Sequence, residues 1–188
     1  MEKKQLLSFL DGTVSAFEKQ DIFALKEAGN KAIEEAALAN DRQLAKLALV
    51  AYALFKMSGK QHIVRHDKWR DVKHDILFDL RKAAKAVESG NAEEFEYRLQ
   101  ATIDSVKATD KEMGNYVQNV FEKARVKYAS TAYSFGLSLG QSAALTGADK
   151  KQLLRYIGVT RIADREAVTT GIGERLKKLK EGIGGSRA

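Results

Sequence analysis

The three histidines of the chain fall together in one short stretch, QHIVRHDKWRDVKHD. Histidine and aspartate side chains are common zinc ligands when at least three of them converge. His62 and His66 are four residues apart, and Asp67 and Asp71 lie close to them in the sequence. Arg70 interrupts this row, however, and its fixed positive charge opposes the binding of a cation. We therefore predict no metal site in this stretch.

The same stretch offers a second kind of chemistry through Arg70 and His74. These residues would share a helix face with His66 if one helix covered all three. An arginine–histidine pair suits general acid–base cleavage of a phosphodiester, as in helical toxin ribonucleases, although the spacing here is tighter. The sequence has no phosphate-binding loop, no dinucleotide fingerprint and no Ser/His/Asp cluster in a supporting context. We favour surface histidines and predict no catalytic residue and no cofactor; a ribonuclease or metal-dependent enzyme using His62–His74 is the alternative.

A different stretch, SLGQSAALTGADKKQLLRYIG, has the pattern of two short helices joined by a tight turn. The first helix is expected over residues 139–146. Gly147 follows it, and glycine tolerates the positive φ that a sharp helix end requires. Asp149 can cap a second helix, which is expected over residues 150–157 and to stop at Gly158.

The side chains of this pair divide into a buried set and an exposed set. Ala143 is expected at the crossing of the two helices, where only a small side chain fits. The residues expected to form the core of the pair are Leu139, Leu145, Leu153 and Ile157. The opposite face of the second helix carries Ala148, Lys151, Gln152 and Arg155. Arginine and lysine suit guanine edges and phosphates, glutamine suits adenine, and a major groove admits such a helix.

Residues 138–156 resemble the helix-turn-helix of MerR-type regulators, through the opening Ser-Leu-Gly, Ala143, Leu-Thr-Gly at 145–147 and the Leu153 region. Residues 132–159 are similar to the small helix-turn-helix antitoxins of prokaryotes. These resemblances imply a three-helix DNA-binding module and, for the antitoxins, a partner protein. The whole chain also resembles an uncharacterised family of archaeal helical proteins, which implies no function.

The distribution of charge agrees with a nucleic-acid-binding end. Residues 1–120 carry 19 Lys/Arg and 19 Asp/Glu, whereas residues 121–188 carry 13 Lys/Arg and 6 Asp/Glu and so hold the whole net charge of +7. A basic third on a neutral body is typical of a surface that meets a polyanion. The residues expected to contact DNA are Lys150, Lys151, Gln152, Arg155, Arg161 and Arg165.

Apolar residues recur at helical spacing through the chain, and no strand-like alternation competes with them. The absence of proline in 188 residues favours helices joined by glycine and polar turns, and the absence of cysteine excludes disulfides and thiolate sites. We predict an all-α protein with five to six body helices and a C-terminal helix-turn-helix. Its expected parts are a neutral helical body (1–109), a long connecting helix (110–136) and a basic module with a flexible tail (137–188).

These features together favour a cytoplasmic DNA-binding protein, either a transcriptional regulator or an antitoxin-like protein, with double-stranded DNA and a partner protein as expected partners. No apolar run is long enough to span a membrane. One helix-turn-helix contacts few base pairs, so a homodimer is expected, and the apolar stripe from Met113 to Phe135 is the surface predicted to pair. A helical protein-interaction adaptor is the remaining alternative.

Overall fold

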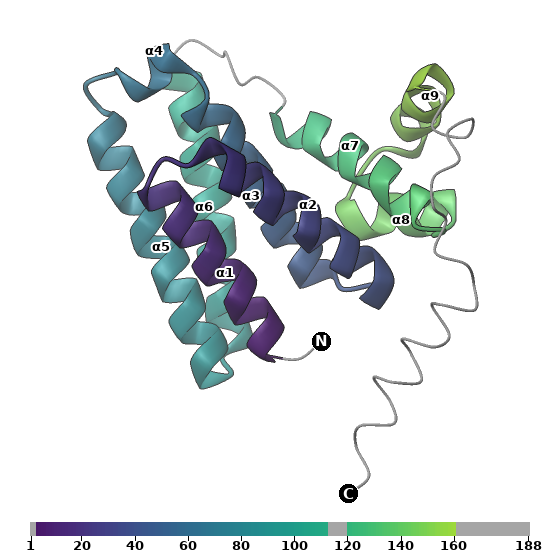
Figure 1. Ribbon diagram of the computed structural model, residues 1–188, viewed down its shortest axis with the longest axis horizontal. Helices are drawn as coiled ribbons and strands as arrows, with labels where there is room; N and C mark the ends of the chain where they lie inside the picture. Colours follow the sequence, from purple (N-terminus) through teal and green to yellow (C-terminus); the bar gives the residue numbers. More distant parts are fainter. Residues whose placement is uncertain (1–2, 113–119, 161–188) are drawn as a thin grey trace, which may run out of the picture.

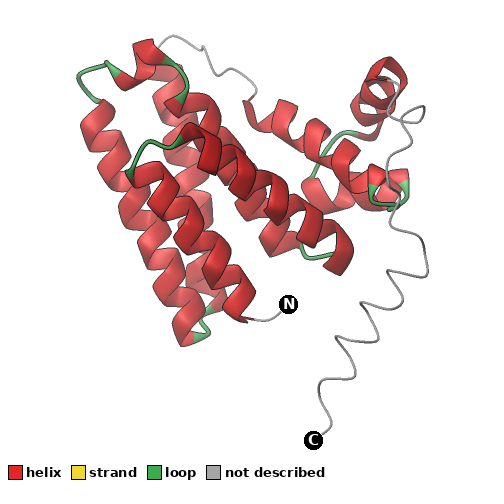
Figure 2. Cartoon of the chain, in the orientation of Figure 1, coloured by secondary structure: helices red, strands yellow, loops and turns green. Residues whose placement is uncertain are grey.

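The computed structural model describes residues 3–112 and 120–160, and this part of the chain is entirely helical (Figures 1 and 2). The all-α prediction is confirmed, but the predicted five to six body helices are too few, because seven helices precede Ser138 in the described residues. One of the seven is a single turn that the sequence analysis missed. The helices are α1 (Lys3–Glu18), α2 (Ile22–Ala39), α3 (Arg42–Ser58), α4 (Gln61–Val64), α5 (Trp69–Ser89), α6 (Ala92–Glu112), α7 (Val120–Ser134), α8 (Leu139–Thr146) and α9 (Lys150–Thr160).

The helix boundaries follow from short polar residues that satisfy free backbone groups. The Asp21 carboxylate accepts from the Ala24 amide at 2.9 Å, and the Asp41 carboxylate accepts from Leu44 at 3.0 Å. The Asn91 side chain accepts from Glu94 at 3.0 Å and starts α6. Each bond pairs one amide of a first helical turn that would otherwise have no partner.

Helix α3 forms the centre of the body. It packs against α1, α2, α4, α6, α7 and α8, and most of its side chains are buried. A helix that is apolar over most of its surface has to be enclosed in this way to remove that surface from water. The pairs α1–α5 and α5–α6 complete the body on one side of α3. No helix in the described ranges has both the length and the apolarity needed to cross a bilayer.

Helix α7 lies across α2 and α3 and carries the following helix pair (Figure 1). The predicted pairing stripe is buried here within the chain itself, through Val120, Phe121, Ala124, Tyr128 and Ala132. In this range the stripe is therefore core, and its assignment to a subunit interface was wrong. The predicted connecting helix (110–136) corresponds to the end of α6 and to α7; residues 113–119, including Met113 and Val117 of the stripe, lie outside the described residues.

Candidate nucleic-acid interface

Helices α7, α8 and α9 pack against one another as a three-helix unit at the end of the molecule opposite α1 and α5 (Figure 1). They have a small hydrophobic core of their own, separate from the main core. Leu139 and Ala148 pack on its edge. The buried members of this core are Ala129, Ala143, Leu153 and Ile157. Leu139, Leu153 and Ile157 thus take their predicted places.

Three details of this small core differ from the prediction. Ala148, expected on the outward face of the second helix, packs on the edge of the core. Leu145 belongs to the main core instead, so it anchors α8 to the body. Ala129 of α7 was missed, although it supplies the third wall against which Ala143 and Leu153 pack. The sequence could have indicated this role of Ala129. A small side chain in the middle of a helix permits two further helices to approach it closely.

Helix α8 is fixed at both ends by local hydrogen bonds. Ser138 and Gln141 form a capping box, in which the Gln141 amide donates to the Ser138 hydroxyl at 3.2 Å and the Ser138 amide donates to the Gln141 side chain at 2.9 Å. At the other end Gly147 has φ 71°, as predicted for the turn, and the Ala148 amide donates to the Ala143 carbonyl at 3.0 Å. The direction in which the chain enters α9 therefore depends on the left-handed backbone at Gly147.

We expect Gly147→Val to loosen this unit by about 1–3 kcal/mol, because a β-branched residue resists positive φ. A Cβ at this position would also meet the Arg125 side chain, whose Nε would be 3.7 Å away. Hydrogen exchange of the α8 and α9 amides should accelerate while the body amides stay protected. Gly158→Val is the matched control, since Gly158 lies within α9 and its added Cβ would meet no atom within 4 Å. Equal exchange in both variants would show that Gly147 does not determine the turn.

Helix α9 starts where the sequence predicts, with the Asp149 carboxylate accepting from the Gln152 amide at 2.8 Å. It does not stop at Gly158 but continues to Thr160. The reason is energetic: glycine inside a helix costs about 1 kcal/mol relative to alanine, which weakens a helix without ending it. As a result, α9 is 11 residues long.

The outward face of α9 carries the predicted contact residues Lys151, Gln152 and Arg155, all of them exposed. Leu153 and Ile157 point the other way, into the small core. Lys150 is exposed but lies over the start of α8, with its Nζ 3.7 Å from the position of a Cβ on Gly140. Arg161 and Arg165, the other two predicted contacts, lie outside the described residues.

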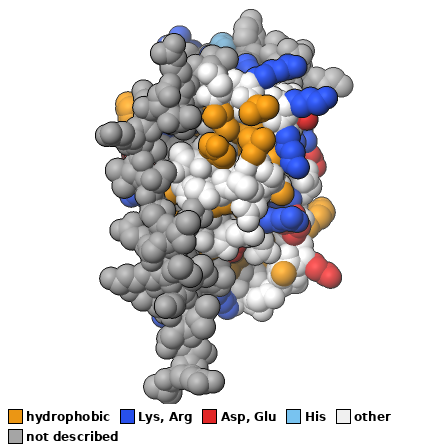
Figure 3. Space-filling view, turned by 90° about the vertical axis from the view of Figure 1, so that its right-hand side faces the viewer, with side chains coloured by type: hydrophobic (Ala, Val, Ile, Leu, Met, Phe, Trp, Pro, Cys, Tyr) orange, Lys and Arg blue, Asp and Glu red, His pale blue; other side chains and the backbone are white. Residues whose placement is uncertain are grey.

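The charge of this end is strongly one-sided. Between residues 123 and 160 the only acidic residue is Asp149, which caps α9. The basic residues in the same range are Lys123, Arg125, Lys127, Lys150, Lys151 and Arg155. Figure 3 faces this end of the molecule and shows a small group of apolar side chains bordered by lysines and arginines. The exposed large apolar residues of α7 and α9 are Tyr133, Leu154 and Tyr156.

The three histidines do not lie on one helix face. Helix α5 begins at Trp69, so His66 lies in the turn before the helix and does not share a face with Arg70 and His74. All three histidines are exposed, and His74 Nδ1 is 3.4 Å from the neighbouring Asp75 carboxylate. No group of three potential metal ligands is present in residues 3–112 and 120–160. A metal cluster built on the histidines is therefore not found in these ranges, whereas Arg70 and His74 lie four residues apart on α5 and are both exposed.

Comparison of the chain with protein-family models, with curated proteins and with solved structures finds no match.

Proposed function

We propose that the protein binds double-stranded DNA through a helix-turn-helix formed by α8 and α9, with α9 as the recognition helix. The observation that carries the proposal is the division of α9 into two faces. Leu153 and Ile157 are buried against α7 and α8, while Lys151, Gln152 and Arg155 are exposed on the opposite side. A major groove accepts a helix presented in this way.

The roles of the three side chains follow from their donors and acceptors. Arg155 can donate two parallel hydrogen bonds to a guanine edge, and Gln152 can both donate to and accept from adenine. Lys151, near the start of α9, suits a phosphate or a guanine. Lys150 lies beside α8 and is better placed for backbone phosphates than for bases. These roles fit a transcriptional regulator or an antitoxin-like protein.

We infer that two copies act together on DNA. Helix α9 has 11 residues, a length of roughly 16 Å at 1.5 Å per residue, and it can contact only a few base pairs. Helix-turn-helix proteins commonly present two such helices about 34 Å apart. Because the apolar side chains of α7 from Val120 to Ala132 are buried within the chain, the pairing surface has to include other residues.

Binding to a mixed-sequence duplex of about 30 base pairs should be strong at low salt and should weaken steeply as salt rises. The physical reason is that each phosphate neutralised by a cation releases a counterion. Fluorescence anisotropy between 20 and 300 mM salt should give a slope of log affinity against log salt near −4, if four or five phosphates are contacted. Sedimentation of the complex gives the number of copies bound. Absence of any binding at the lowest salt would contradict the proposal.

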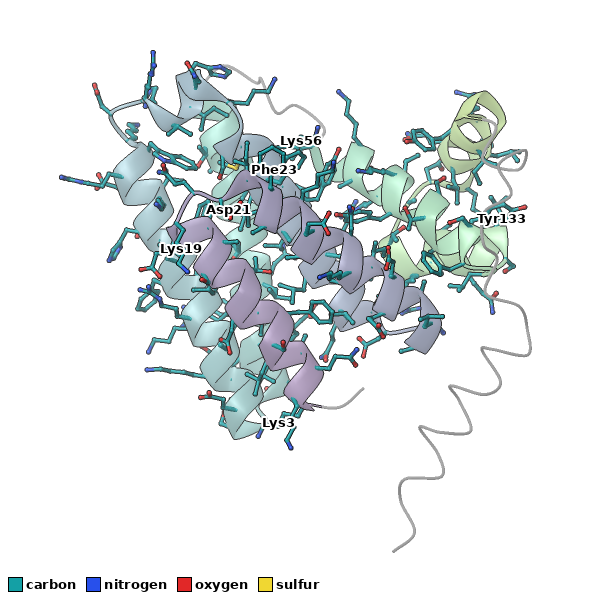
Figure 4. The ribbon with its side chains drawn as sticks, viewed as in Figure 1. Lys3, Lys19, Asp21, Phe23, Lys56 and Tyr133 are labelled. Carbon is teal, nitrogen blue, oxygen red and sulfur yellow. The ribbon has the colours of Figure 1, made fainter. Side chains whose placement is uncertain are left out.

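A protein-interaction adaptor is the second candidate, and a specific observation favours it. Leu154 is 60% exposed on α9, and Tyr133 and Tyr156 are exposed next to the same unit. Figure 4 shows Tyr133 at the outer edge of the molecule, away from the body. Exposed aromatic and leucine side chains are typical of surfaces that bind another protein. An antitoxin-like protein would use both surfaces, one for DNA and one for its partner.

A further inference from the structure

Three lysines from three different helices converge beside α9. They are Lys26 of α2, Lys56 of α3 and Lys127 of α7. Two of them lie near the ring of Tyr52, with the Lys127 Nζ 4.8 Å and the Lys56 Nζ 5.4 Å from its centroid. Their residue numbers differ by 30 and by 71, so only the tertiary structure brings them together.

This cluster has no ion-pair partner in the part of the chain that the structure describes. None of the ion pairs found in the described residues includes Lys26, Lys56 or Lys127. Lys127 is moreover half-buried. Burial, followed by the nearby ammonium groups of Lys56 and Lys26, lowers the pKa of Lys127 below its ordinary value. Like charges that are held together and partly removed from water cost free energy, which a bound anion would offset.

The aromatic side chains explain how the protein tolerates the cluster without an anion. The Lys56 Nζ also lies 5.0 Å from the centroid of Phe55, and the Lys127 Nζ lies 5.8 Å from that of Tyr128. The faces of aromatic rings are electron-rich and attract ammonium groups. They hold the lysines in place but do not neutralise them, so the positive potential of the cluster remains available to a ligand.

The lysine cluster lies near α9. Tyr156 of α9 is close enough to Tyr52 to contribute, after burial, to raising the pKa of the Tyr52 phenol. The cluster therefore adjoins the unit that contains the outward face of α9. Lysine is a common point-charge binder of phosphate, and several converging ammonium groups match the charge of a dianion.

We propose that Lys56 and Lys127, with the charge of Lys26 nearby, form a phosphate-binding site at the junction of α2, α3 and α7. The phosphate can belong to a nucleic-acid backbone or to a free phosphorylated ligand, since both present the same oxygen atoms. The site does not require α9 to contact bases, so it is independent of the helix-turn-helix proposal.

The test uses the full chain with two probes, inorganic pyrophosphate and the 30-base-pair duplex. Binding of each probe is measured by calorimetry or anisotropy. Mass spectrometry then measures whether the bound probe protects Lys127 against acetylation of its amine. The variant is Lys56→Gln with Lys127→Gln. The matched control is Lys4→Gln with Lys85→Gln, which removes the same charge from exposed positions on α1 and α5.

We expect at least one probe to protect Lys127 and to bind roughly tenfold more weakly to the Lys56/Lys127 variant, with less than a twofold change in the control. If only pyrophosphate protects Lys127 and binds the variant more weakly, the site takes a free phosphorylated ligand. If the duplex shows these effects, and the variant has a smaller salt slope, the ligand of the site is a phosphate of the DNA backbone. If Lys127→Gln fails to fold, Lys56→Gln alone, at an exposed position, is measured in the same way. No protection by either probe, or equal weakening in the control, would overturn the site.

Discussion

Gly29→Ala is expected to destabilise the protein by about 2–4 kcal/mol, although alanine is the better helix former. Gly29 lies in the middle of α2 and faces α7. A Cβ built on it falls well under 3.0 Å from the Tyr128 hydroxyl, and it is 3.4 Å from the Ala48 carbonyl oxygen. Tyr128 is 1% exposed and its ring packs edge-on against Tyr52 at 5.5 Å, so it has no free space into which to move.

Gly12→Ala is the matched control for this substitution. Gly12 lies within α1, is exposed, and a Cβ there would meet no atom within 4 Å. Only helix propensity then changes, which should stabilise the protein by about 0.5–1 kcal/mol. Urea denaturation of both variants measures the difference. If Gly29→Ala also stabilised the protein, α2 and α7 would not pack as closely as the structure indicates.

A second substitution separates the steric effect from other causes. The Tyr128 hydroxyl is buried and finds no hydrogen-bond partner among the described residues, and burial raises the pKa of this phenol, so it stays neutral. Tyr128→Phe removes the oxygen that would meet the new methyl group and loses no hydrogen bond. We expect Tyr128→Phe alone to change stability little and to recover most of the loss in Gly29→Ala. Additive effects of the two changes would exclude a direct clash.

The features that the sequence predicted correctly are those formed by neighbouring residues. Asp149 caps α9 through the amide of Gln152, three residues later, and Gly147 takes its left-handed backbone within a single turn. Such contacts can be inferred from a few letters because their geometry is local. The outward position of Lys151, with Leu153 on the opposite face, follows equally from helical periodicity.

The features that were missed depend on contacts between distant segments. The stripe on α7 is apolar whether it packs on α2 and α3 or on a second chain, so periodicity could not identify its partner. A leucine such as Leu145 could pack in the main core or in the small core of α7, α8 and α9. Only the position of α8 relative to α3 places it in the main core. The lysine cluster likewise joins positions 26, 56 and 127, which no local pattern connects. The sequence contained one local indication of this cluster. Lys127 directly precedes Tyr128, an apolar position of the α7 stripe, so a cation is placed next to a buried aromatic side chain.

Charge reversal on α9 is expected to have the largest effect on DNA binding. Lys151→Glu with Arg155→Glu removes two cations and places two carboxylates against phosphates, which should weaken duplex binding roughly 100-fold or more at 100 mM salt. Loss of folding is not the expected cause. Both positions are exposed, Asp149 still caps the helix, and a glutamate in the first turn of α9 interacts favourably with the helix dipole. Circular dichroism and thermal melting should stay close to those of the unaltered protein.

The control and a third variant determine what the α9 residues contribute. Lys4→Glu with Lys85→Glu changes the net charge equally but lies on α1 and α5, so it should weaken binding far less. Gln152→Ala should relax the preference among duplex sequences while leaving the salt slope unchanged, because an amide side chain releases no counterion. If reversal at α9 and reversal on the body weakened binding equally, the interaction would depend on net charge alone. The helix-turn-helix proposal would then fail, whereas the lysine cluster would still be tested separately by its own variants.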